Sequence, residues 1–264
     1  MPFWKRSPLV DSSYADFAFE CFEWHLRNTK TFWTRPLVQP NDRFFPQKGL
    51  QGHDLALAVF EVVRRVSGLH QRSIRLEAQD PGPNTRLGAL VSTRGAGLPE
   101  GTFQRLEREA LITYDPSLTG DPILLVATIA TQLAHYLMYT FRDRPPWVEG
   151  SYWQTTEIGA VFLGCGLFLA GSHFEFSQHT DTFSKGWHTR TRGQLSEPQI
   201  LYALAIFCAL RAVPADEVLP YLKGHLRGSY KKAFREVSDR APQIDALRAI
   251  RRETGVELQS LPTG

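Results

Sequence analysis

Cysteine is scarce in this chain, with three residues, Cys21, Cys165 and Cys208, among 264. No two of them have the CxxC spacing, and no CxxC combines with an HxxxH pattern, so a structural zinc finger has no support. At least two of the three lie in apolar helical runs, where a free thiol behaves as a small hydrophobic side chain. An odd number of cysteines without a disulfide pattern favours a reducing compartment, and we expect a cytoplasmic protein.

The chain also lacks a large excess of charge of either sign. The net charge is only +3, and lysine and arginine are scattered without a basic block. We therefore expect neither nucleic acid nor a membrane surface as a partner. The phosphate-binding patterns GxxxxGK[ST] and GxGxxG are missing, as is the GxSxG turn of serine hydrolases. Gly164 to Gly166 lie in an apolar helical run, so they indicate close packing, and the intervening Cys165 is a weak nucleophile because burial raises a thiol pKa.

A continuous apolar segment of signal-peptide type is not found in MPFWKRSPLVDSS, and we expect no targeting segment there. Two later runs, Ile123 to Tyr139 and Thr156 to Ser172, approach the roughly 20 residues that cross a bilayer. The first carries Thr128 and Gln132, the second carries Glu157 and several glycines, and neither has aromatic and basic flanks on both sides. These features predict two central helices buried in a core rather than membrane spans.

Helical periodicity also covers much of the rest of the sequence. Asp11 to Asn28 predicts an amphipathic helix with Ser12 or Ser13 as its N-cap. His53, near the start of the next helix, is interpreted as a surface or capping residue. Further helices are predicted over Gly52 to Ser67, Pro214 to Glu236 and Pro242 to Glu253. Three short strands are predicted over Arg72 to Glu77, Gly88 to Thr93 and Ala110 to Tyr114.

Two helix starts carry clear signals. Asp121 followed by Pro122 gives the first central helix an N-cap and a proline at its first position, and this helix is expected to end near Arg142. Ser196 and Gln199 match the capping-box pattern ahead of the run ILYALAIFCALRA, which is apolar around most of its circumference. That run is expected to complete a core of three helices.

The sharpest chemical signal lies in the first central helix, in the segment ATIATQLAHYLM. Thr131, Gln132 and His135 stand where the zinc-protease motif HExxH has His, Glu and His. This segment resembles the ATxAHELAHxLL helix of small bacterial gluzincin-like metallopeptidase relatives. TTEIGAVFLGCGLFLAGSHF resembles the next helix of that family, and the likeness runs in order from about Asp42 to about Ala233. It implies a zincin or minigluzincin-like α+β fold, mostly helical with a small β-sheet.

The resemblance also implies roles for individual residues. The second zinc ligand of the family falls on His135 and its downstream acidic ligand on Glu157, while the first ligand falls on Thr131 and the general base on Gln132. A neutral threonine hydroxyl is a poor zinc ligand, and a glutamine amide cannot accept a proton from water near neutral pH. The resemblance therefore implies a retained fold without peptidase activity. Zinc is not the expected state, and His135 and Glu157 are vestigial metal positions.

Three functions follow from this hypothesis. The favoured one is a pseudopeptidase that binds an unknown protein or peptide in the vestigial cleft. The second is a remodelled metal hydrolase in which His135 and Glu157 are joined by a loop histidine; the candidates are His173, His179 and His188. The third is a structural protein whose cleft has filled in, with His135 as a core histidine hydrogen-bonded to Glu157 or to a tyrosine. A closed apolar surrounding of His135 would favour this third function.

The length of the chain is compatible with one domain spanning residues 1–264. Within it we expect an N-terminal helix and irregular lead-in over 1–40 and a metallopeptidase-like core over 41–236. A C-terminal helix and tail are expected over 237–264.

Overall fold

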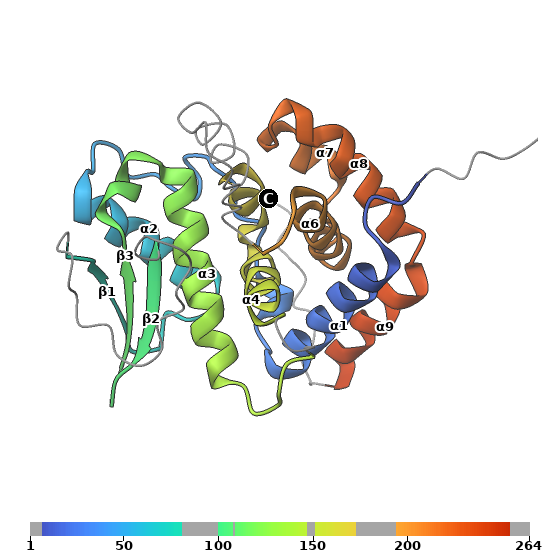
Figure 1. The fold of residues 1–264 in the computed structure, drawn as a ribbon, viewed down its shortest axis with the longest axis horizontal. Coiled ribbons are helices and arrows are strands. Elements are labelled where there is room, and N and C mark those ends of the chain that lie inside the picture. Colours follow the sequence, from blue (N-terminus) through green and yellow to red (C-terminus); the bar gives the residue numbers. More distant parts are fainter. Residues whose placement is uncertain (1–6, 81–99, 108, 147–150, 173–193, 254–264) are drawn as a thin grey trace, which may run out of the picture.

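The protein is mostly helical, with one small β-sheet at one side (Figure 1). The computed structural model describes residues 7–80, 100–107, 109–146, 151–172 and 194–253. The combination of many helices with one small sheet confirms the predicted α+β class. The helices are α1 Ser12–Asn28, α2 Gly52–Val66, α3 Pro122–Thr140, α4 Tyr152–Ala160, α6 Glu197–Arg211, α7 Ala215–Val218, α8 Gly224–Ser238 and α9 Ala241–Glu253, and the strands are β1 Ile74–Ala78, β2 Gly101–Arg105 and β3 Ala110–Tyr114.

The sheet has the order β1-β3-β2. β1 runs parallel to β3, and β2 runs antiparallel to β3 on its other side. Ile74, Phe103 and Ile112 are buried where α2 and α3 pack over the sheet. Two predicted strands are confirmed within one or two residues, while the prediction over 88–93 lies outside the described residues. β2 was not predicted, because its sequence GTFQR has too few β-formers to stand out.

α3 begins as its sequence predicts. The Asp121 side chain accepts a hydrogen bond from the Leu124 amide at 3.1 Å, and Pro122 occupies the first turn. The helix ends at Thr140, before the expected Arg142, because the backbone of Phe141 turns to an extended conformation. Both α3 and the stretch Tyr152–Ser172 are long and apolar enough to cross a membrane, but 56% and 89% of their apolar windows are buried in the fold. Such burial is what core helices show.

A π-helical turn, Val161–Cys165, interrupts the second central helix after α4. At this turn Gly164 has φ +93°, and its carbonyl accepts a hydrogen bond from the Val38 amide at 2.9 Å. The Phe162 carbonyl lies 3.4 Å from Nη1 of Arg35, whose guanidinium is buried over the Phe162 ring at 5.0 Å. Groups of the segment after α1 therefore donate hydrogen bonds to backbone carbonyls of this irregular turn, where the regular helical hydrogen-bond pattern is interrupted.

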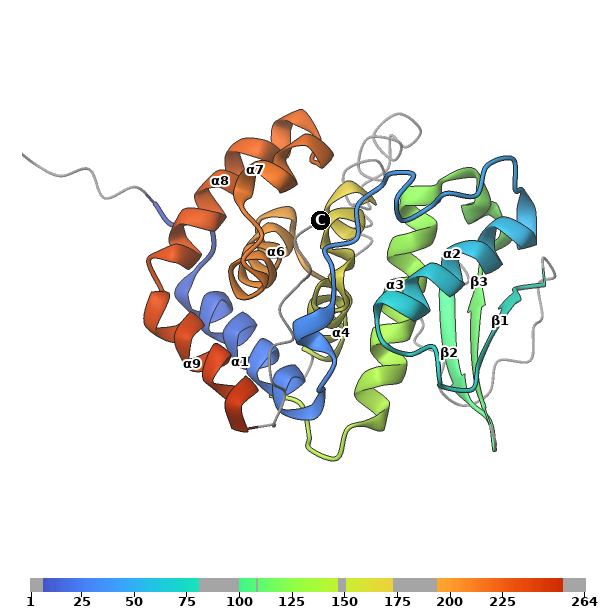
Figure 2. The same ribbon diagram turned by 180° about the vertical axis from the view of Figure 1, so that it is seen from behind.

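α6 lies between α4 and the C-terminal helices (Figure 2). Its start confirms the capping prediction, since the Gln199 side chain accepts from the Ser196 amide at 2.8 Å. The helix predicted over 214–236 is divided, because Pro220 falls within it and cannot donate a helical hydrogen bond. A 3₁₀ turn, Leu219–Tyr221, therefore separates α7 from α8.

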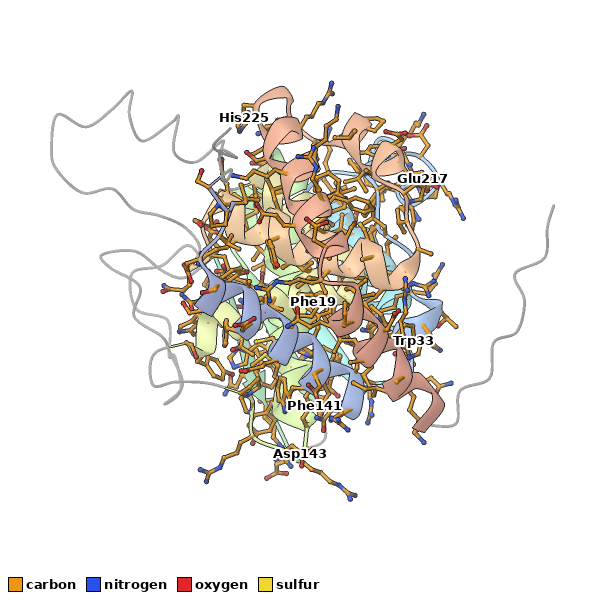
Figure 3. All side chains as sticks on the ribbon, turned by 90° about the vertical axis from the view of Figure 1, so that its right-hand side faces the viewer. Phe19, Trp33, Phe141, Asp143, Glu217 and His225 are labelled. Carbon is orange, nitrogen blue, oxygen red and sulfur yellow. The ribbon has the colours of Figure 1, made fainter. Side chains whose placement is uncertain are left out.

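α1 packs against α9, and α8 packs against α6. The outer side of this helical group is seen in Figure 3, where Phe19 of α1 points toward the C-terminal helices. The guanidinium of Arg240 lies 5.8 Å from the centre of the Phe19 ring. The N-cap of α1 is Asp11, whose carboxylate accepts from the Tyr14 amide at 2.7 Å, so the expected Ser12 or Ser13 cap was wrong.

Candidate functional site

The helix face that carries the HExxH-like positions lies against β2. Gly101 of β2 makes this close approach possible, because a Cβ atom there would be 2.9 Å from both the Thr113 carbonyl oxygen and the Thr128 Cγ2 atom. It would also be 3.1 Å from Cγ of Gln132. The sequence signal for this contact was a single glycine, which by itself does not reveal what approaches it.

The first two motif positions are engaged within the protein. Thr131 donates its hydroxyl proton to the Ala127 carbonyl of the preceding turn, at 2.9 Å. Gln132 is buried at 8% exposure, with its side chain packed toward Gly101. A threonine bonded in this way is held against its own helix backbone, and a glutamine amide has no basic lone pair for water activation. Neither side chain supplies what HExxH chemistry needs.

His135 is half-buried and lies among aromatic rings. Its ring centroid lies 5.0 Å from that of Phe103, 5.3 Å from Tyr152 and 5.5 Å from Trp153, and all three contacts are edge-on. Nδ1 is buried and has no hydrogen-bond partner within the described residues, so this nitrogen does not form the bond to Glu157 or a tyrosine that the structural alternative included. Desolvation lowers the pKa of His135 to about 4, which keeps the imidazole neutral at pH 7.

Glu157 is buried in α4, and its carboxylate has backbone partners. Oε1 accepts from the Gln194 amide at 2.9 Å, and Oε2 accepts from the Leu195 amide at 2.9 Å and from that of Gln194 at 3.1 Å. The apolar run from Thr156 to Ser172 placed Glu157 at the start of the second central helix, but this helix already begins at Tyr152. The carboxylate instead holds the chain just before α6.

Removing this carboxylate is expected to destabilise the fold. We expect Glu157→Ala to lower the free energy of unfolding by about 2–4 kcal/mol, because two amides lose a charged acceptor in a buried place. Glu157→Gln retains one acceptor oxygen and should cost roughly half as much. Urea denaturation followed by circular dichroism measures both. The control is Glu20→Ala on the exposed side of α1, which should change stability by less than about 0.5 kcal/mol. Equal losses for Glu157→Ala and Glu20→Ala would contradict the structural role.

The residues at the motif positions do not fit a zinc ion. Within the parts of the chain that the structure describes, no group of three His, Cys, Asp or Glu side chains could hold a metal. The donor set comprises a back-bonded threonine, an amide, one neutral histidine and a carboxylate bonded to backbone amides. Structural and catalytic zinc sites use three or four strong donors. The loop candidates His173, His179 and His188 lie outside the described residues.

The outer edge of β2 offers backbone groups. The Glu100 carbonyl accepts from Asp115, and the Leu106 amide donates to the Glu109 carbonyl, so the even-numbered residues between them pair with β3. By the alternation of an antiparallel ladder, the amides and carbonyls of the odd-numbered residues, 101, 103 and 105, point away from β3. Within the described residues β2 pairs only with β3.

Aromatic side chains line the α3 side of this edge. Phe103 contacts Tyr136 at 5.8 Å and Tyr139 at 5.7 Å between ring centroids, and Tyr139 is 50% exposed. Arg105 extends over Tyr139, with its guanidinium 5.6 Å from the ring centre and 3.3 Å from the hydroxyl. Sequence reasoning missed this cluster. The pair Tyr152 and Trp153, at the start of α4, was a visible signal of aromatic residues near His135.

The remaining predicted histidine agrees with its surface interpretation. His53 is exposed at the start of α2, and its Nδ1 lies 3.0 Å from the Tyr114 hydroxyl. It is not part of a metal-ligand group within the described residues.

No protein-family model matches this chain, and neither a curated protein nor a solved structure is significantly similar to it.

Proposed function

We propose that this protein is a non-catalytic relative of the small gluzincin-like metallopeptidases, a pseudopeptidase that binds an extended peptide along β2. The observation that carries the proposal is that the four side chains at the motif and ligand positions all make contacts within the protein. Thr131 bonds to its own helix, Gln132 packs against Gly101, His135 lies among aromatic rings and Glu157 binds backbone amides. Side chains engaged in this way support a loss of metal-dependent hydrolysis.

The arrangement of the sheet and α3 supports the zincin-like part of the proposal. Three short strands precede the helix that carries the degenerate motif, and the last of them, β3, lies in the middle of the sheet. The edge strand β2 is antiparallel and lies directly beside that helix. This is the neighbourhood that the resemblance implies for a motif helix in a small zincin fold.

The edge of β2 supports the binding part. Outward-pointing amides and carbonyls of an edge strand can add an extended peptide as a further strand, and neighbouring pockets or rings then select its side chains. Here the rings of Phe103, Tyr136 and Tyr139 supply an apolar surface beside those backbone groups. Tyrosine and arginine are also the residue types that contribute most to binding at protein interfaces.

Elemental analysis and peptide binding together test the proposal. We expect substoichiometric zinc in the purified protein and no change in metal content in His135→Ala. Immobilised random decapeptides are then screened, and a selected peptide is N-methylated one residue at a time. Strand addition requires that methylation at alternate residues abolishes binding while methylation at the intervening residues has little effect. Tyr139→Ala should weaken binding about tenfold, with Tyr221→Ala as the control on a distant turn.

The aromatic surroundings of the half-buried His135 favour a second candidate, a structural protein with a filled cleft. Failure of every decapeptide to bind, together with the absence of zinc, would support this second candidate. Near-stoichiometric zinc that disappears in His135→Ala would overturn both candidates and favour a remodelled metal hydrolase.

A further inference from the structure

A groove lies on the opposite side of α2 from the protein core. The segment that leads into α2 runs beside this helix (Figure 2), and the two enclose a cavity of about 390 Å³. We call it the α2 groove; its main lining side chains are Arg43, Phe44 and Pro46 from the segment and Leu57, Val62 and Arg65 from the helix. It does not include any residue of the HExxH-like motif, of β2 or of the aromatic cluster on α3.

Apolar and charged side chains share the lining of the α2 groove. Leu57, which lines the groove, is 37% exposed, and Leu50, in the segment that leads into α2, is 36% exposed. These are two of the three large hydrophobic side chains that are exposed in the described parts of the chain, the third being Tyr139. Exposed apolar residues on a flat surface are ordinary, but Leu57 lies in the lining of a concave surface beside Phe44 and Pro46, which favours a partner that covers it.

The charges around the groove favour an anionic partner. Two nearby carboxylates already have cationic partners, since Asp42 pairs with Lys48 at 2.8 Å and Glu61, which lines the groove, pairs with Arg64 at 2.9 Å. Arg43 and Arg65 make no ion pair with any described residue and are exposed at the groove. Their guanidinium groups can bind carboxylates in a bidentate manner.

The size of the groove fits a short peptide. Leu57 and Arg65 are eight residues apart on α2, which corresponds to about 12 Å along the helix axis. An extended peptide covers that length with about four residues.

We propose that the α2 groove is a second binding site, for a peptide segment of another protein in which an apolar anchor residue is flanked by aspartate or glutamate. The anchor packs on Leu57 and Val62, and the flanking carboxylates bind Arg43 and Arg65. This site is separate from β2 and does not depend on the function proposed for it.

Fluorescence polarisation with a defined probe tests the site. The probe is a labelled hexapeptide, Glu-Leu-Asp-Phe-Glu-Leu, and the comparison peptide has lysine at each acidic position. The full-length protein is used with Arg65→Glu, with Leu57→Asp and with the matched control Arg235→Glu. Arg235 is, like Arg65, an exposed arginine in the last turn of a helix without an ion pair among the described residues. Circular dichroism confirms that each variant is folded.

We expect saturable binding of the acidic peptide that weakens with added salt, and at least about tenfold weaker binding for Arg65→Glu. Leu57→Asp should have an effect of similar size, while Arg235→Glu should change the Kd less than about twofold. Tyr139→Ala, which affects the β2 edge, should leave this binding unchanged. The proposal is overturned if the acidic peptide does not bind, if the lysine peptide binds equally well, or if Arg65→Glu and Arg235→Glu have equal effects.

Discussion

Replacing Gly164 with alanine is expected to lower the free energy of unfolding by about 2–5 kcal/mol. Gly164 has φ +93° at the π-helical turn, a conformation that alanine rarely adopts. An added Cβ would lie 2.5 Å from the Pro36 carbonyl oxygen, well inside van der Waals contact. Neither backbone can move freely, because the Gly164 carbonyl is itself hydrogen-bonded to the Val38 amide. The backbone strain at positive φ and the overlap of the new Cβ with the Pro36 oxygen therefore both destabilise the folded state.

Gly228→Ala in α8 is the matched control for this substitution. Gly228 is exposed within a helix, and a Cβ atom there would meet nothing within 4 Å. Alanine should increase stability at this position by about 0.5–1 kcal/mol, because it lowers the entropy of the unfolded chain and has the higher helix propensity. Urea denaturation at pH 7 measures both variants. A loss below about 1 kcal/mol for Gly164→Ala would show that Pro36 and Gly164 are not held in this arrangement.

Acidification below about pH 6.5 is expected to destabilise the protein steeply, chiefly through His25. This side chain is fully buried at the end of α1, stacked on Phe162 at 4.7 Å between ring centroids. Among the residues that the structure describes, neither of its ring nitrogens has a hydrogen-bond partner of normal geometry. Burial, with a further contribution from the Arg35 charge, lowers the pKa of His25 to about 3. Arg35 is itself buried, with no carboxylate partner in the described parts of the chain, and burial lowers its pKa to about 9.

The sign of the effect follows from where the proton binds. Above about pH 6.5 the imidazole of His25 is neutral in both the folded and the unfolded chain, so folding does not change its charge. Between that pH and about pH 3 the unfolded chain binds a proton and the folded chain does not. The free energy of unfolding therefore decreases as the pH is lowered through this range, by up to about 1.4 kcal/mol per pH unit. His135 contributes in the same direction until about pH 4.

Urea denaturation at pH 7, 6, 5 and 4 measures this dependence. His25→Phe removes the titrating group while keeping an aromatic ring, and it should reduce the slope by up to about 1.4 kcal/mol per pH unit. His70→Ala, at an exposed position, is the control and should leave the slope unchanged. The prediction is contradicted if the His25→Phe and wild-type proteins lose stability in parallel between pH 6 and pH 4.

Local signals identified much of the fold. The Asp121-Pro122 pair and the Ser196 capping box predicted the starts of α3 and α6, and both are observed, because a cap depends on residues only three or four positions apart. β2 escaped prediction for the opposite reason. Its five residues form a strand through pairing with β3 and packing against α3, and these contacts are absent from its own sequence.

At the candidate site, too, the sequence predicted the positions of residues but not their tertiary contacts. Sequence reasoning placed His135 and Glu157 on two neighbouring central helices, and α3 and α4 do pack together. It did not predict that Phe103, Tyr152 and Trp153 surround His135, or that Glu157 binds the Gln194 and Leu195 amides. These partners lie up to 38 positions away in the chain. Periodicity indicates which side of a helix is buried, but it does not indicate what is buried against it.

By itself, the sequence determined that this chain forms apolar central helices with a small sheet, and that two of the residues required for HExxH chemistry are missing. These properties depend on residue type and short spacing. Only the tertiary structure decided what the remaining polar groups contact and where Gly164 allows two backbones to meet. It also decided that two arginines without an ion pair among the described residues border the α2 groove. Each of these depends on residues that are distant in the chain, and their proximity is set by how the helices and the sheet pack.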